Sequence, residues 1–281
     1  MSVFGVDYAW GRPGASELRK AGARFACRYL SHDTTGKNLT RAEADQLSAG
    51  GLWLVVVWES TASRALSGRS GGADDAEDAA KQARACGMPA DRPIYFAVDF
   101  DADADQQDAI NAYLDGAASV LGRDRVGLYA GYWPLKRAFD AKKITYGWQT
   151  YAWSGGHWDE RAQLQQYSNG HEINGVGVDY DRAMDDDYGQ WKVGGSPKPP
   201  VPSKAPKWPG RNITQPPVMH GNDVRAWQRQ MHARGWRITV DGAYGASSEN
   251  VCRAFQREKH LRVDGVVGQA TWKAAWDSPV T

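Results

Sequence analysis

Long apolar segments are missing from this 281-residue sequence, and so is a recognisable leader. No apolar run approaches the roughly 20 residues that a membrane-spanning helix needs. The first residues, MSVFGVDYAWG, contain no basic segment followed by an apolar stretch, so they do not resemble a signal peptide. We therefore expect a protein that is made in a cytoplasm and does not insert into a membrane.

Cysteine is scarce, and metal-binding patterns are absent. The three cysteines, Cys27, Cys86 and Cys252, are scattered and odd in number, which favours small buried side chains over disulfide partners or metal ligands. Of the six histidines, only His157 and His171 fall in loops near the ends of predicted strands, and no HxxEH or similar run gives them a metal-binding partner. A zinc amidase and a cysteine peptidase are weakly supported, and we expect neither a metal nor a cofactor.

The formal net charge is only +1, but it hides two parts of opposite sign. Residues 1–192 hold 21 Lys and Arg against 27 Asp and Glu, whereas residues 193–281 hold 13 against 6. A basic segment can bind nucleic acid, yet neither a recognition helix nor an aromatic platform accompanies these cations. An anionic cell wall would satisfy the same charge, so we expect a wall partner and no nucleic acid.

Strand-like apolar runs alternate with helical segments in residues 1–192. The runs interpreted as strands are Val3–Asp7, Phe25–Leu30, Leu52–Trp58, Ile94–Asp99, Val126–Ala130, Trp148–Ala152, Leu164–Tyr167 and Val176–Tyr180. The segments interpreted as helices are Ala15–Ala21, Thr40–Ala49, Ala73–Cys86, Asp105–Leu121 and Pro134–Ala141. Alternation of this kind predicts a parallel sheet, and eight strands favour a closed barrel over an open sheet. We therefore predict an α/β fold with an irregular, TIM-like (β/α) barrel over residues 1–192.

A cluster of acids ends the fourth predicted strand, in the segment RPIYFAVDFDADAD at 92–105. An uninterrupted apolar run that rises into acids is typical of a buried strand ending at a mouth open to water. Because side chains alternate along a strand, Asp99 and Asp101 would project to the same face, about 7 Å apart. Two close, partly desolvated carboxyls can divide the roles of proton donor and charged partner, as glycoside hydrolysis requires.

Other candidates follow the remaining strands. Asp7, Glu59 and Asp179 stand at the expected carboxyl ends of parallel strands, where barrel enzymes place their chemistry. Taken singly, each acid also fits a helix cap or a loop ligand, and Asp181 is left unassigned. Four indoles follow strand ends and could stack on sugar rings, although core packing explains any one of them equally well: Trp10, Trp58, Trp133 and Trp153.

The amino-acid composition changes after residue 192. Eight of the thirteen prolines fall between 197 and 217, which predicts a semi-extended linker at 193–212. Residues 213–281 contain a short repeat, VDGAYG at 240–245 and VDGVVG at 263–268, in which each copy leads into a helical segment. This part therefore predicts a small three-helix domain.

Two family resemblances follow from these motifs. GNDVRAWQRQMHARGW, the doubled VDGxxG and TWKAAW closely resemble the peptidoglycan-binding domain type 1 family. Residues 1–192 resemble the glycoside-hydrolase-like domain of actinobacterial cell-wall proteins and phage lysins, which is similar to the Chalaropsis-type lysozymes of glycoside hydrolase family 25. The matching pieces are FGVD at 4–7, IYFAVDFD at 94–101, GLYA at 127–130, QQYS at 165–168 and GVDY at 177–180.

The resemblance implies a monomeric, endolysin-like muramidase that binds and cleaves peptidoglycan. It implies catalytic roles for Asp7, Asp99, Asp101 and Asp179, and it adds Tyr129 and Gln166 to the substrate-binding candidates. It also implies that a lysin of phage type waits in the host bacterial cytoplasm before release, although first residues without a signal-peptide pattern equally fit a bacterial protein exported by another route.

One departure from the lysozyme pattern leaves alternatives open. In those lysozymes the fourth strand ends in Asp-x-Glu, with the Glu as proton donor, whereas this sequence has Asp99-Phe100-Asp101. Asp101 could reach the glycosidic oxygen, or Glu59 could take the role. Otherwise the domain binds glycan without cleaving it, or the protein acts on the peptide part of the wall as an amidase or peptidase.

Overall fold

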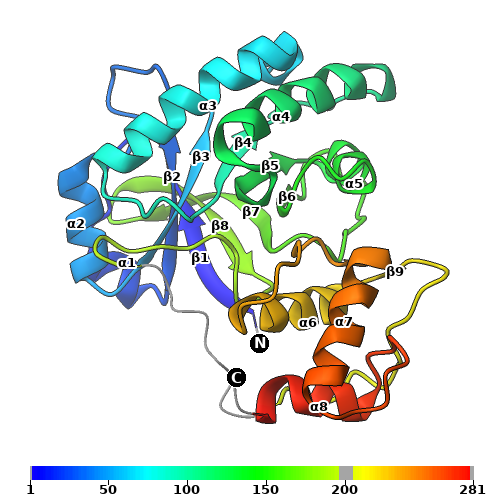
Figure 1. Ribbon diagram of the computed structural model, residues 1–281. Helices are drawn as coiled ribbons and strands as arrows, with labels where there is room; N and C mark the ends of the chain where they lie inside the picture. Colours follow the sequence, from blue (N-terminus) through cyan, green and yellow to red (C-terminus); the bar gives the residue numbers. More distant parts are fainter. Residues whose placement is uncertain (1, 196–204, 279–281) are drawn as a thin grey trace. The chain divides into compact units, whose positions relative to one another are not determined.

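The computed structural model describes residues 2–195 and 205–278, which divide into two compact units, residues 1–197 and 198–281 (Figure 1). The predicted linker at 193–212 lies partly outside the described residues, at 196–204. Within the described parts, no helix is long and apolar enough to cross a membrane.

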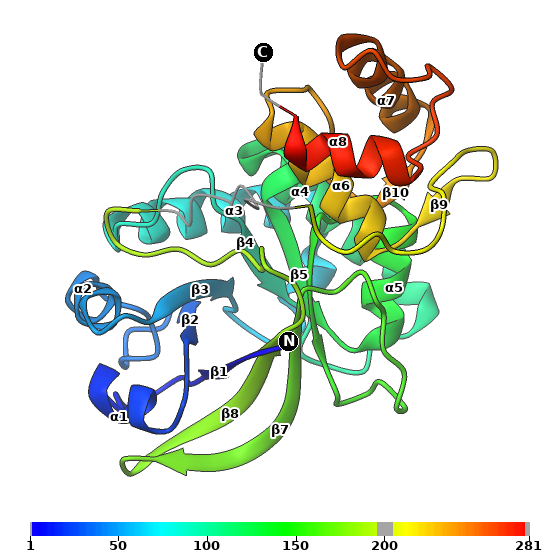
Figure 2. The ribbon, with the colours of Figure 1, turned by 90° about the horizontal axis from the view of Figure 1, so that it is seen from below.

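The first unit is a closed eight-stranded barrel in which the strands follow one another in chain order. Its strands are β1 (Val3–Asp7), β2 (Phe25–Leu30), β3 (Trp53–Trp58), β4 (Ile94–Ala97), β5 (Val126–Ala130), β6 (Tyr146–Thr150), β7 (Leu164–Ile173) and β8 (Val176–Ala183). Neighbours from β1 to β7 are parallel, whereas β8 is antiparallel to both β7 and β1. Figure 2 shows β7 and β8 as a long two-stranded ribbon beside β1. The predicted α/β barrel is thus confirmed.

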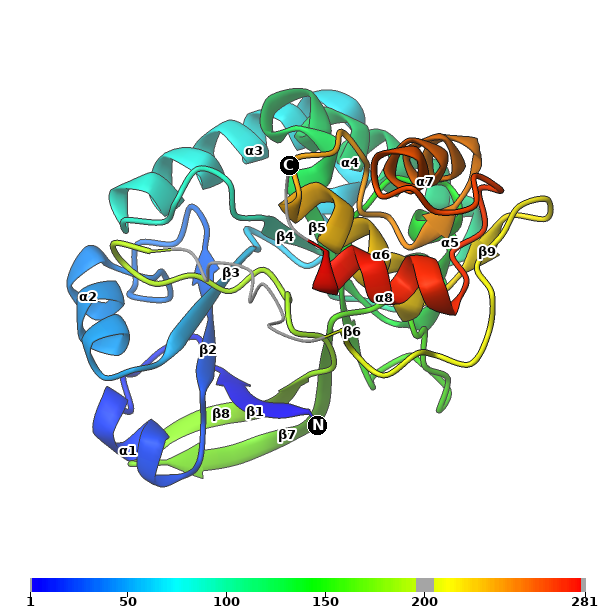
Figure 3. The ribbon, with the colours of Figure 1, turned by 60° about the horizontal axis from the view of Figure 1, so that its bottom comes forward.

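Helices connect the first six strands, as expected. They are α1 (Ala15–Lys20), α2 (Arg41–Ala49), α3 (Gly68–Ala85), α4 (Gln107–Leu121) and α5 (Tyr132–Asp140), with 3₁₀ turns at Arg64–Ser67, Ala104–Gln106 and Arg123–Arg125. Figures 1 and 3 show α3 and α4 side by side. Their backbones meet at two glycines: a Cβ at Gly72 would lie 1.9 Å from the Tyr113 carbonyl oxygen, and one at Gly116 would lie 1.9 Å from that of Arg69. Only glycine fits such a crossing.

Three local expectations were wrong. The fourth strand ends at Ala97, so Asp99 and Asp101 lie beyond it and the alternation of side chains along a strand does not relate them. The seventh strand extends to Ile173 because it pairs with β8 in a hairpin. Finally, Asp179 does not end a parallel strand. It lies inside the antiparallel β8, directly opposite Asp7 of β1.

The second unit is helical, as predicted. It contains α6 (Asn222–Ala233), α7 (Ala246–Glu258), α8 (Gln269–Asp277) and two short paired strands, β9 (Met219–His220) and β10 (Ala243–Tyr244). The repeat has a structural cause, because a buried glutamine from the preceding helix ties down each VDG turn. Gln228 donates to Asp241 at 2.8 Å and accepts from Gly242 at 2.7 Å, while Gln256 does the same with Asp264 and Gly265, both at 2.9 Å.

Candidate active site

The barrel interior is apolar at one end and polar at the other. Residues two apart on a strand share a face, so the inward positions can be followed along each strand. The apolar part includes Phe25, Val55, Tyr95, Leu164, Ala183 and Tyr188, all buried. Toward the carboxyl ends of the parallel strands the inward side chains become polar: Asp7, Tyr29, Tyr129, Thr150, Gln166, Asp179 and Asp181. The polar end of a closed barrel is where chemistry is expected.

Gln166 is the centre of this polar layer. It is only 3% exposed, and its amide oxygen accepts from the Tyr129 hydroxyl at 2.9 Å and the Thr150 hydroxyl at 2.8 Å. Its amide nitrogen donates to Asp7 at 2.8 Å and, more weakly, to Asp179 at 3.5 Å. Two of the substrate-binding candidates, Tyr129 and Gln166, are therefore bonded to each other and to the acids of the site.

Asp7 and Asp181 form the buried base of the site. Asp7 is 2% exposed, and its two oxygens accept from the Tyr29 hydroxyl at 3.0 Å and from Gln166. Burial raises the pKa of Asp7 to about 6. Asp181 is fully buried, accepts from the Trp148 indole at 2.9 Å and has its pKa held well above the ordinary range, by burial first and then by the charge of Asp7. Sequence reasoning left Asp181 unassigned, although its spacing of two from Asp179 on one strand places both on the inward face.

Asp99 is the half-buried carboxyl of the site. Burial raises its pKa, the positive charge of Lys37 opposes that rise, and the negative charge of Asp179 adds to it. Asp179 is partly exposed and accepts a backbone hydrogen bond from Gly170 at 2.9 Å. Asp101 is exposed to solvent. The Asp99 carboxyl therefore interacts electrostatically with that of Asp179, from across the barrel, and with that of Glu59, which follows β3.

Glu59 lies in an ion pair. Its carboxylate meets the Lys37 ammonium at 2.6 Å, with the two side chains 18% and 12% exposed. Burial raises the pKa of Glu59, and the hydrogen bond from Lys37 opposes that rise. Lys37 also lies 4.6 Å from the centre of the Tyr29 ring and 5.9 Å from that of Trp10. No pattern in the sequence pointed to Lys37, which a loop between β2 and α2 brings to the acids.

Exposed aromatic side chains follow the carboxyl ends of the parallel strands. Trp10, Trp133 and Trp153 are 58%, 46% and 39% exposed, and Tyr151, which the sequence analysis did not single out, is 47% exposed. Trp58 differs from them, since it is 1% exposed and packs edge-on against His32 in the core between barrel and helices. Uncovered rings at the end of the barrel that carries the acids suit the apolar faces of a sugar chain.

Residues 2–195 and 205–278 contain no set of side chains suited to bind a metal ion. Within these residues, no group of three or more His, Cys, Asp or Glu side chains could hold an ion. The three cysteines are free and buried.

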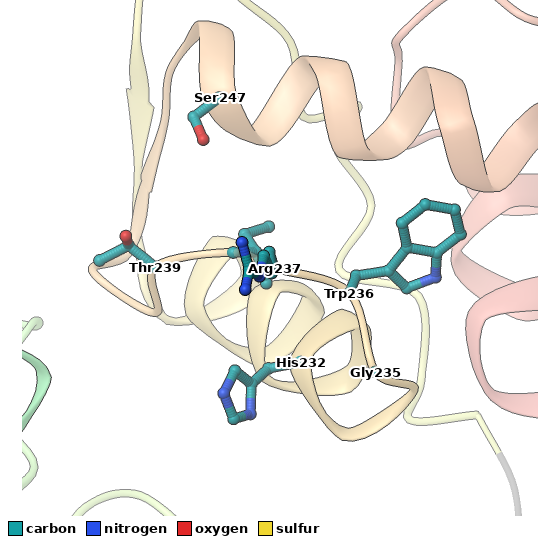
Figure 4. Close-up of a pocket in the computed structure, with 7 residues that line it drawn as sticks. His232, Gly235, Trp236, Arg237, Thr239 and Ser247 are labelled. Carbon is teal, nitrogen blue, oxygen red and sulfur yellow. The ribbon is translucent and has the colours of Figure 1, made fainter.

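The second unit has a pocket of its own, with a volume of about 610 Å³. Figure 4 shows Arg237 between Ser247 at the start of α7 and His232 near the end of α6, with Trp236 to one side. Gly235, Ile238 and Thr239 complete the lining, which contains no carboxylate. Its chemistry suits an anionic group.

Comparison with known proteins matches each unit to a family. Residues 16–188 match the family described as "Rv2525c-like, glycoside hydrolase-like domain", and residues 220–275 match the "Putative peptidoglycan binding domain" family. A relative from Mycobacterium tuberculosis H37Rv, named "Putative peptidoglycan hydrolase Rv2525c", is 33% identical over 200 residues, which are 66% of this chain and 82% of the relative.

Solved structures agree with that match. The crystal structure of the M. tuberculosis Tat-secreted protein Rv2525c with L-tartrate has a TM-score of 0.65 and 32% identity, covering 67% of this chain and 98% of that one. A family 25 glycosyl hydrolase from Bacillus anthracis has a TM-score of 0.47 and 16% identity, covering 66% and 93%, which is too remote to support an argument about this chain.

One expectation is contradicted by these comparisons. The first residues do not resemble a signal peptide, which predicted a location in the host cytoplasm until release. The relative of known structure is described as Tat-secreted, which points to export instead.

Proposed function

The chain belongs to the Rv2525c-like, glycoside hydrolase-like family and carries a C-terminal peptidoglycan-binding domain, and from this premise we propose that it cleaves the glycan strand of peptidoglycan. The observation that carries the proposal is the environment of Asp99. Its carboxyl is half-buried at the polar end of the barrel, and burial and the charge of Asp179 both raise its pKa. Exposed indoles beside the acids support a sugar polymer as the substrate.

Asp99 is the proton donor in this proposal. A general acid must still hold its proton near neutral pH, and burial together with the nearby negative charge of Asp179 favours the protonated form. The proton passes to the glycosidic oxygen as the bond to the leaving sugar breaks. Asp179 stabilises the positive charge that develops on the sugar ring. Water then adds to the anomeric carbon and releases a proton, so that Asp99 is protonated again for the next turnover.

The other acids have different places around Asp99 and Asp179. Asp7 is buried, and both of its oxygens are already hydrogen-bonded, so it holds Gln166 rather than touching substrate. Gln166 in turn reaches Asp179. Glu59 is neutralised by Lys37, which leaves it poorly suited to donate a proton. Asp101 is exposed to solvent, unlike the half-buried Asp99.

The second unit binds the cell wall in this proposal. Its family match and its basic composition support this role, and Arg237 and His232 in the pocket favour an anionic part of the wall. A tether of this kind raises the local concentration of substrate for the barrel. We propose residues 1–192, 193–212 and 213–281 as barrel, linker and wall-binding domain. Limited proteolysis that never cuts within 193–212 would count against this division.

Digestion of purified cell walls tests the activity. New reducing sugars would support a glycosidase, new amino groups would instead indicate an amidase or peptidase, and neither product would leave a wall-binding protein. Because the relative of known structure is Tat-secreted, we propose that the protein acts after export; fractionation of native cells would test this location.

A further inference from the structure

Few hydrogen-bond donors surround the two buried carboxyls of the barrel, Asp7 and Asp181. Asp7 receives one hydrogen bond on each oxygen, from Tyr29 and from Gln166. Asp181 receives one on Oδ1, from the Trp148 indole, while no donor in the described residues reaches its fully buried Oδ2. A buried acceptor without a donor is costly, and a buried second negative charge is costlier still.

The groups around Asp181 offer no compensating positive charge. Those that interact with it electrostatically are Asp7 on β1, Cys27 on β2, Tyr129 on β5, Tyr167 on β7 and Asp179 on β8. In their neutral forms the thiol and the phenols add no charge, and the other two groups are acids. Within residues 2–195, no Lys, Arg or His forms an ion pair or hydrogen bond with either Asp7 or Asp181. Two negative charges would therefore repel each other in a dry interior.

A single proton removes both problems. Placed on Oδ2 of Asp181, it cancels one charge and turns the unpaired acceptor into a donor, and the Asp7 carboxylate lies within side-chain hydrogen-bond contact of Asp181 to accept it. We propose that Asp181 is a positioning residue that stays protonated at neutral pH and donates to Asp7. The high pKa of Asp181 agrees with this assignment, and so does its hydrogen bond to Asp7, which lowers the pKa of Asp7 against the larger effect of burial.

The consequence for the site is a fixed charge and a fixed geometry. Asp7 keeps a single negative charge, held by Tyr29, Gln166 and the proton of Asp181. Its hydrogen bond then orients the Gln166 amide, which also reaches Asp179 at the proposed reaction centre. The proton stays in place throughout turnover, so Asp181 acts through its neighbours. This catalytic consequence rests on the proposed glycosidase function, whereas the protonation itself does not.

The protonation can be measured without any substrate. In the full-length protein with ¹³C-labelled Asp carboxyls, NMR between pH 4 and 8 should show one carboxyl that remains protonated at pH 7 and is missing in Asp181→Asn. A second carboxyl should titrate near pH 6, where the pKa of Asp7 lies. Asp108→Asn, which removes an exposed carboxyl at the start of α4, should leave both signals in place. If every carboxyl of the wild-type protein were ionised at pH 7, the proposal would be overturned, whether or not the variants fold.

Wall hydrolysis adds a separate measurement. Asparagine can replace the proton of Asp181 with an N–H donor, so Asp181→Asn should lose far less activity at pH 7 than Asp181→Leu. Asp181→Leu leaves Asp7 without this donor and should lose about tenfold or more. Equal losses in a folded Asn and a folded Leu variant would contradict the donor role. If the wild-type protein does not cleave walls, the proposed function fails, but the NMR result still decides the protonation.

Discussion

The proton on Asp181 should make stability depend on pH in a defined direction. The ordinary pKa of an Asp carboxyl is near 3.8, so the unfolded chain releases this proton in mild acid, while the folded barrel retains it. Above that pH the folded state binds one more proton than the unfolded state. The free energy of unfolding must therefore fall as pH rises, until the pH reaches the folded-state pKa of Asp181.

The variant Asp181→Asn isolates this effect, because asparagine has no proton to release. One extra bound proton changes the free energy of unfolding by about 1.4 kcal/mol per pH unit. Between pH 5 and 7 the wild-type protein should thus lose about 3 kcal/mol relative to the variant. Asp7 contributes with the same sign up to its pKa of about 6, but burial, the largest cause of its shift, remains in the variant. Its contribution therefore cancels largely in the difference.

Urea unfolding of the full-length proteins at fixed ionic strength, repeated at each pH, measures the difference. Tryptophan fluorescence can follow the transition, and the barrel transition is the one that Asp181→Asn shifts. Asp108→Asn should give a difference that does not vary with pH. A flat difference for Asp181→Asn over the same range would mean that Asp181 is ionised in the folded protein, and the reasoning would fail.

Further predictions concern the proton donor, the pocket and the helix crossing. Asp99→Asn should lower wall hydrolysis by about 100-fold or more while leaving wall binding intact. Asp101→Asn, at an exposed position, should lower wall hydrolysis by less than about tenfold. Equal losses of activity would mean that Asp101 also takes part in the reaction. Arg237→Ala should weaken wall binding by a few-fold and make it less sensitive to salt, because one charge contact is removed, and pull-down across a salt series would measure this. Gly116→Ala should cost at least about 1–3 kcal/mol in urea unfolding because its Cβ would overlap the α3 backbone, whereas Gly177→Ala, with open space at its Cβ, should cost far less.

The alternation of strands and helices was readable because each element carries its own pattern. Val3–Asp7 and Phe25–Leu30 were predicted with the bounds that the structure has, since buried strands of a closed barrel are almost wholly apolar. Strand direction was harder to read, because an isolated strand looks the same in parallel and antiparallel pairs. The position of Asp179 opposite Asp7 therefore followed from barrel closure and not from a shared carboxyl edge.

The candidate site was only partly accessible from the sequence. Asp7, Asp99 and Asp179 stand out because acids directly after or within apolar strands are unusual. Lys37 and Asp181 do not, since the ion pair with Glu59 and the contact with Asp7 join residues that are far apart in the chain. Trp58 shows the opposite error: its place beside Glu59 suggested a sugar platform, but its side chain points into the core. Which face of a strand a ring occupies depends on register, and that is a property of the sheet.

The pairing of β1 with β8 has a consequence for the order of folding. Val3 pairs with Ala183 and Asp7 with Asp179, so these are contacts between parts of the chain that emerge from the ribosome far apart in time. Contacts across so long a loop form late, because the entropy of closing the loop must be overcome first. The acids thus come together only when the last strand docks onto the first. A nascent chain that ends after β6 holds Asp7, Glu59 and Asp99 but lacks Gln166, Asp179 and Asp181, so the polar layer is complete only after β7 and β8 have docked.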